Sequence, residues 1–141
     1  MGLRRKGREI ALQTFYALSF SGENDVDLSI FEAKLEEISS SKEHELDNKI
    51  LEFSKEILAN TIANITAIDE KIAEHSTNWK MSKIAMVDLS ILRIATYELL
   101  FTSTPPAIIM NEAIEIAKRY SSESSSKFVN GILNSITAEL A

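Results

Sequence analysis

The stretch WKMSKIAMVDLSILRIATYELLF, residues 79–101, decides the fold of this chain. From residue 84 to residue 101, 13 of 18 residues are apolar, and they occupy every face of a helix rather than one stripe. A helix that is apolar all round is a buried helix. A membrane span needs about 20 residues with few or no charges, whereas Asp88, Arg93 and Glu98 recur here every five residues. The stretch therefore predicts a central helix in the core of a protein rather than in a bilayer.

Helical periodicity extends over the rest of the chain. Apolar residues recur at spacings of three and four in residues 4–20, 28–38, 45–74, 108–120 and 128–136. We expect a break between Asn64 and Asp69, where short polar side chains compete with the helix. Pro105 and Pro106 end the central helix and suit the start of another. The serine-rich run 121–126 offers several N-caps and is interpreted as a helix connection. Since no useful alternation of period two appears, the sequence predicts an all-α fold of about seven helices.

The composition indicates one soluble domain. A chain of 141 residues with 45% hydrophobic content is long enough to bury a core of its own. The absence of cysteine excludes a disulfide framework and agrees with a reducing compartment, so we expect the cytoplasm. A secretory signal is rejected because Glu9 adjoins the first apolar run and no A-x-A cleavage site follows.

Charge is distributed unevenly along the sequence. Residues 1–8 carry four basic side chains and no acid, whereas residues 9–141 carry 11 basic against 21 acidic side chains. Cations at the start of a helix oppose its dipole, which costs a few tenths of a kcal/mol each. A bound phosphate would reverse that cost, because it would meet the free N–H groups and the basic side chains together. Charge alone leaves two interpretations open, a phosphate-binding tip or a solvated terminus.

The sequence contains no recognisable catalytic apparatus. His44 and His75 are the only histidines, and neither belongs to an H-E-x-x-H or similar metal-binding spacing, so we expect both at the surface. There is no glycine-rich phosphate loop and no G-x-S-x-G elbow. We therefore predict no enzymatic activity, no catalytic residue, no cofactor and no metal site.

Four segments together resemble one known family. These are RRKGREIALQTFY (4–16), NWKMSKIAMVDLSILRIATYELL (78–100), PPAIIMNEAIEIAKRY (105–120) and SSKFVNGILNSI (125–136). In this order and at these separations they resemble the NusB family of bacterial transcription antitermination factors. The resemblance implies a single RNA-binding domain over residues 1–141, built of two small helical bundles around the buried central helix. It also implies a monomer or a homodimer that binds boxA RNA of ribosomal RNA leader transcripts together with the small-subunit ribosomal protein NusE, in an antitermination complex with RNA polymerase.

The resemblance also implies binding residues. The RNA-binding positions are Arg4, Arg5, Lys6, Arg8, Ser124, Lys127 and Phe128. Tyr16 and Asp88 match positions near the NusE-facing side. Ser124 stands where some members have an acid, and Gly7 stands where many have alanine, so we expect Gly7 to loosen a basic arm. For Phe128, core packing is the alternative to RNA stacking. An aromatic ring beside cations suits single-stranded RNA, because bases stack on the ring while the cations hold phosphates.

Two other functions remain open from the sequence. Some cytosine-5 ribosomal RNA methyltransferases begin with a NusB-like domain, which would require this sequence to be a piece of a longer enzyme. A helical adaptor that binds only proteins would explain the acidic surface without using the arginines. Binding of boxA-type RNA separates these alternatives from the antitermination factor.

Overall fold

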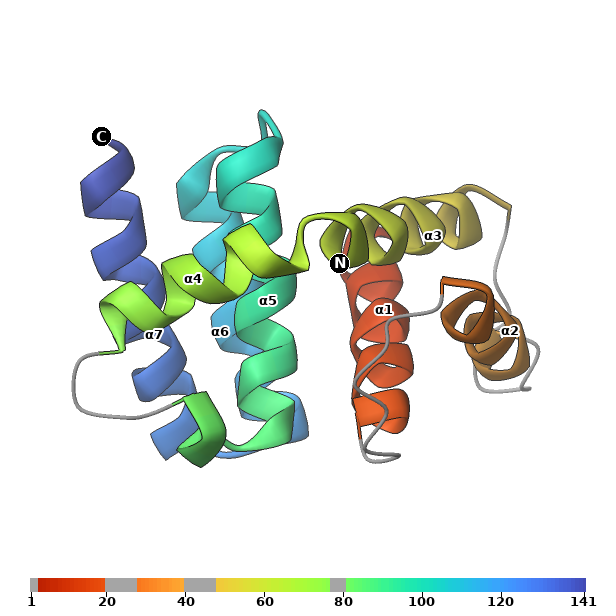
Figure 1. The fold of residues 1–141 in the computed structure, drawn as a ribbon, viewed down its shortest axis with the longest axis horizontal. Helices are drawn as coiled ribbons and strands as arrows, with labels where there is room; N and C mark the ends of the chain where they lie inside the picture. The colour runs from red at the N-terminus through yellow and green to blue at the C-terminus, as the bar shows by residue number, and fades with distance from the viewer. Residues whose placement is uncertain (1–2, 20–27, 40–47, 77–80) are drawn as a thin grey trace. The chain divides into compact units, whose positions relative to one another are not determined.

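The computed structural model describes residues 3–19, 28–39, 48–76 and 81–141. Within these ranges the chain forms seven α-helices and one short 3-10 helix, with no strand (Figure 1). The helices are α1 (Leu3–Ser19), α2 (Leu28–Ser39), α3 (Asn48–Ala63), α4 (Ile65–His75), η1 (Met81–Lys83), α5 (Met86–Phe101), α6 (Pro106–Tyr120) and α7 (Glu123–Leu140). The all-α prediction is confirmed. Among the described helices, none is long and apolar enough to cross a membrane.

The chain divides into two compact units, Met1–Ala63 and Asn64–Ala141. This division confirms the prediction of two small helical bundles, while the assignment of both to a single domain stays a prediction. In the first unit α1 packs against α2 and α3. Its core contains Ile10 and Phe15 of α1, Leu35 of α2 and Ile57 of α3, all of them buried.

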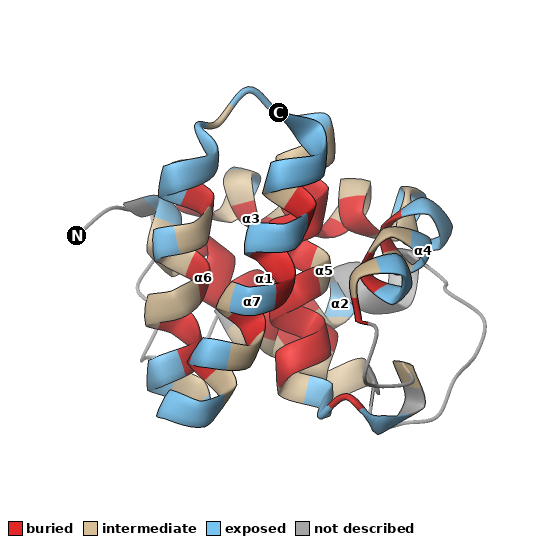
Figure 2. Cartoon of the chain, turned by 90° about the vertical axis from the view of Figure 1, so that its left-hand side faces the viewer, coloured by how far each residue is buried: buried red, intermediate tan, exposed pale blue. Residues whose placement is uncertain are grey.

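The second unit is built on α5, which packs against α4, α6 and α7. Every residue from Asp88 to Glu98 is buried except Arg93, and Figure 2 shows the middle of α5 mainly in the colour of buried residues. The exception is accounted for by α4, because Arg93 Nε and Nη2 donate to the two carboxylate oxygens of Asp69 at 2.8 and 2.9 Å. The predicted burial of the central helix is confirmed.

The expected helix boundaries are also found. Asn64 separates α3 from α4, within the range where a break was expected. Pro106 is the first residue of α6, where its missing N–H is not needed. Ser122 is the N-cap of α7, since its side-chain oxygen accepts a hydrogen bond from the Ser125 N–H at 3.0 Å. The serine-rich run therefore contains the capped start of α7. The helix begins at Glu123, five residues before Phe128, where the apolar period resumes.

Candidate nucleic-acid interface

The four N-terminal cations lie on the first two turns of α1 and not on a projecting arm. Arg4 is exposed, Arg5 and Lys6 are half-buried, and Arg8 is only 5% exposed. The guanidinium carbons of Arg4 and Arg8 lie 5.2 and 5.4 Å from the centre of the Phe53 ring on α3. Cations at this distance from an aromatic face are attracted by the ring quadrupole. Phe53 thus holds two of the four cations within the first unit.

Gly7 brings α1 and α3 together at this point. A Cβ atom at Gly7 would lie 2.7 Å from Phe53 Cδ2 and 3.3 Å from Ser54 Oγ, so only glycine fits there without a shift of the ring. The Ser54 hydroxyl donates a buried hydrogen bond of 2.9 Å to the Gly7 carbonyl oxygen. The structure therefore differs from the expectation that Gly7 loosens the terminus. Gly7 tightens it, because the missing side chain permits a close helix contact.

The burial of Arg8 differs from the expectation of four free cations, and helix geometry explains the difference. Residues four apart lie on the same helix face. Arg4 and Arg8 consequently share a face with Ala11 and Phe15, which are buried in the core of the first unit. The aliphatic part of an arginine tolerates such a position. Arg8 is thus part of the packing between α1 and α3.

A second group of polar and aromatic side chains surrounds a pocket in the second unit. The pocket has a volume of about 270 Å³ and is lined by Lys83, Ile84, Ala85, Asp88, Ser124, Ser125 and Phe128. It lies at the amino ends of α5 and α7, with η1 beside them. Phe128 is half-buried and forms part of the wall, so its ring is not enclosed in the core. Lys127 is exposed on the same helix start.

Serine hydroxyls hold the carboxylate of Asp88 in place beside this pocket. Ser125 Oγ donates to Asp88 Oδ2 at 3.1 Å and lies 2.7 Å from Ser121 Oγ. Asp88 is 6% exposed, and its Oδ1 atom has no hydrogen-bond partner among the described residues. Burial raises the pKa of Asp88 above its ordinary value, while the hydrogen bonds from Ser125 and Ser121 oppose the shift. The pocket is thus lined by an aromatic ring and by a carboxylate that is held by serine hydroxyls and buried.

Comparison with known proteins identifies the family. A family model described as the NusB family matches residues 5–138. The chain belongs to the NusB family. A curated relative from Citrifermentans bemidjiense, named transcription antitermination protein NusB, is 40% identical over 145 residues, covering 98% of this chain and 96% of its own.

Solved structures of NusB proteins share the fold. The structure titled T. maritima NusB is 37% identical, with a TM-score of 0.83 and coverage of 96% of this chain and 91% of its own. A structure titled antitermination factors NusB and NusE in complex with dsRNA matches with a TM-score of 0.84 over 97% of both chains. At 24% identity, the latter shows the fold alone.

The binding residues that the NusB resemblance implies are divided between the two units. Tyr16 belongs to α1 of the first unit, with Arg4, Arg5, Lys6 and Arg8. Asp88 lines the pocket with Ser124 and Phe128 of the second unit, and its contact with NusE stays a prediction. Sequence reasoning did not single out Phe53, Lys83 or Ser125 as part of either group. The exposed cation Lys83, five residues before a buried acid, is a signal that could have indicated the pocket.

Proposed function

We propose that this chain is a transcription antitermination factor that binds boxA-type single-stranded RNA together with NusE, within an RNA polymerase complex. Membership of the NusB family and the name of the curated relative support this function. The observation that carries it is the pocket, which is lined by the Phe128 ring and by the exposed cation Lys83. Single-stranded RNA is bound by aromatic rings that stack on bases and by cations that hold phosphates.

The geometry favours different roles for the binding residues. Arg4, Arg5 and Lys6 retain exposed surface and would contact phosphates, whereas the buried Arg8 would hold the Phe53 ring against α1. In the second unit Phe128 would stack on a base. Its neighbours Ser124 and Lys127 are exposed beside it and would contact the RNA backbone.

Asp88 and Tyr16 are proposed to contact NusE. NusB and NusE occur together in the solved complex whose title names both, and that chain shares this fold. Cooperation between RNA and NusE follows if each ligand stabilises the same bound arrangement. We propose a non-enzymatic, cytoplasmic factor.

The test is a pair of reciprocal titrations. Fluorescence anisotropy with a labelled boxA-type RNA measures affinity with and without NusE, and a scrambled RNA of equal length is the control. NusE should raise the affinity for RNA, and RNA should raise the affinity for NusE by the same factor, because coupling between two sites is reciprocal. If RNA left the affinity for NusE unchanged, the cooperative part of this function would be wrong.

A matched pair of aromatic variants tests the pocket. Phe128→Ala should weaken RNA binding by about 1 to 3 kcal/mol, the contribution of stacking on one base. Phe101→Ala is the control, since Phe101 is an aromatic residue with exposed surface at the carboxyl end of α5, whereas the pocket lies at the amino end of that helix. Equal RNA affinities for the two variants would remove Phe128 from the interface.

The adaptor is the second candidate, and one observation favours it. Outside residues 1–8 the chain is strongly acidic, which opposes binding to a polyanion. An adaptor would bind NusE with unchanged affinity in the presence of RNA and would not distinguish boxA-type from scrambled RNA. The same titrations therefore decide between the two candidates.

A further inference from the structure

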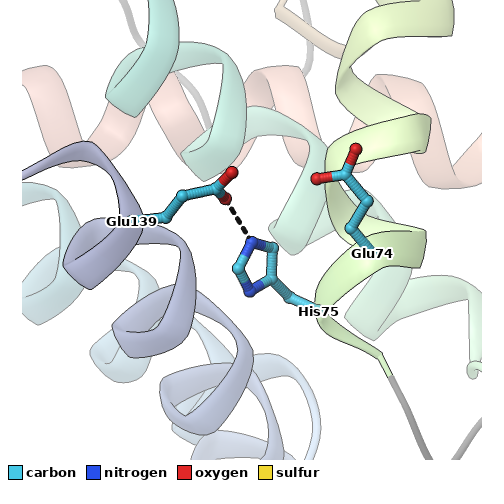
Figure 3. A group of neighbouring side chains, drawn as sticks. All are labelled: Glu74, His75 and Glu139. Atoms are coloured by element: carbon cyan, nitrogen blue, oxygen red, sulfur yellow. Dashed lines mark hydrogen bonds and ion pairs between the residues drawn. The ribbon is translucent and has the colours of Figure 1, made fainter.

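A histidine and two glutamates meet in the second unit, away from the pocket. Glu74 and His75 come from the last turn of α4, and Glu139 comes from the last turn of α7. Figure 3 shows the three side chains directed toward the same space, and their potential ligand atoms lie within 4.8 Å of one another. We propose that Glu74, His75 and Glu139 bind a zinc ion that joins α4 to α7.

The imidazole of His75 is already oriented for this role. Its Nδ1 atom lies 2.7 Å from Ser135 Oγ, and its Nε2 atom pairs with Glu139 Oε2. The side chain is 15% exposed, so the ring is held between the two helices. A metal-binding histidine usually donates its second ring N–H to a neighbouring oxygen, which fixes the ring and the tautomer. Ser135 would accept that hydrogen bond and leave Nε2 for the metal.

The electrostatics of the cluster favour a cation. The carboxyl end of a helix carries partial negative charge, and two such ends contribute here in addition to two carboxylates. Negative charge from four sources thus converges on one place.

The ammonium group of Lys71 is the cation that pairs with these two carboxylates in the structure. Its Nζ atom lies 3.1 Å from Glu139 Oε1 and 3.2 Å from Glu74 Oε2, so the ammonium group bridges the same two carboxylates. A zinc ion would displace this ammonium group from the carboxylates, and the proton on His75 Nε2 would be released to solvent when that nitrogen binds the ion. The side chain of Lys71 is flexible and 22% exposed, so it can swing into solvent when the ion binds. Lys71 is therefore a competitor whose removal should strengthen metal binding.

The ligand types select zinc over the common hard cations. One imidazole nitrogen with two carboxylate oxygens suits zinc, whereas magnesium and calcium prefer oxygen ligands alone. With metal–ligand distances near 2.0 to 2.2 Å, tetrahedral ligand atoms lie about 3.4 Å apart. The potential ligand atoms now lie within 4.8 Å of one another, so small rotations of these side chains would bring them to that spacing. Water would take the fourth position.

A competition titration tests the site. The metal-free protein is titrated with zinc against a chromophoric chelator, and we expect one zinc per chain. Glu139→Gln and His75→Ala should each lower the affinity by at least about tenfold, because each removes a ligand or its negative charge. His44→Ala, at the only other histidine, is the control and should bind as the wild type does. Millimolar magnesium should not compete.

Lys71→Met provides the decisive variant, since it removes the competing ammonium group while keeping the length of the side chain. It should bind zinc about tenfold more tightly than the wild type. Circular dichroism would confirm that each variant keeps its helices. No zinc uptake by the wild type, uptake that survives both Glu139→Gln and His75→Ala, or uptake unchanged by Lys71→Met would overturn the proposal and leave a purely intramolecular ion-pair cluster.

Discussion

The two helices that carry the proposed RNA contacts, α1 and α7, use their surfaces in opposite ways. On α1 the face that begins with Arg4 and Arg8 is also the face that packs on α3, so Arg8 is buried against Phe53. On α7 the buried face is formed by Ser126, Val129, Ile132, Leu133 and Ile136. Ser124, Lys127 and Phe128 retain exposed surface beside that face.

This difference predicts that RNA binding and stability depend on the same face of α1 but on separate faces of α7. A change on the basic face of α1 must alter the contact with Phe53, and therefore the free energy of unfolding. A change at the first turns of α7 leaves the buried stripe intact. Each helix also contains one glycine, which provides a matched pair. Gly7 lies against Phe53, whereas no atom of the described residues in other elements lies within 4 Å of a Cβ added at Gly131.

The largest effect is expected from the buried face of α7. Leu133 is fully buried, so Leu133→Ala should lower the free energy of unfolding by about 2 to 5 kcal/mol by leaving a cavity. RNA affinity, measured at a temperature where the variant is folded, should not change. Urea denaturation and anisotropy give the two quantities, and a loss of RNA affinity in the folded variant would show that stability and binding are coupled on α7 as well.

A smaller loss of stability is expected at Gly7. Gly7→Leu places atoms where Phe53 and Ser54 now lie, and overpacking of this kind costs about 1 to 3 kcal/mol. RNA binding should weaken at the same time, since Arg4 rests on the displaced Phe53 ring. A variant with lower stability but wild-type RNA affinity would contradict the shared role of this face.

The two arginines over Phe53 separate charge from packing. Arg4→Ala should reduce the slope of log K against log salt by about 0.7, the value for one phosphate contact with a single strand. Arg8→Ala should instead lower the melting temperature and leave the slope unchanged, because its guanidinium group is buried. Equal changes of slope in both variants would mean that Arg8 turns outward to meet RNA.

The smallest effect is expected at Gly131. Gly131→Ala should raise the free energy of unfolding by about 0.5 to 1 kcal/mol, because alanine loses less backbone entropy in a helix and meets no neighbouring atom here. RNA affinity should stay at the wild-type value. Thermal denaturation measures the gain, and a loss of stability would indicate a contact on this face of α7 that the isolated chain does not show.

Much of the fold follows from short-range patterns. The apolar residues around α5 predicted its burial, Asn64 and Pro106 lie at helix boundaries, and Ser122 caps α7. Each of these features depends on residues within one or two helical turns, so the sequence displays the cause directly. The division into two compact units at residue 63 also agrees with the two predicted bundles.

The candidate site was predictable only in part. The resemblance supplied Arg4, Ser124 and Phe128, but it did not indicate Phe53 or the hydrogen bond between Ser125 and Asp88. The spacing of Arg4, Arg8, Ala11 and Phe15 already indicated that Arg8 lies on the inward face. The apolar spacing of this stripe therefore predicts the burial of Arg8, whereas its charge alone predicts exposure.

The sequence by itself determined which segments are helical, which helix is buried and where the cations are concentrated, because propensity, periodicity and capping act between neighbours along the chain. Only the tertiary structure decided that Phe53 receives two arginines, that Ser125 reaches Asp88, and that Glu139 meets His75. Ser125 and Asp88 are 37 residues apart in the sequence, and His75 and Glu139 are 64 residues apart. Such contacts depend on how whole helices pack, and helix packing is set by the combined shape of many side chains.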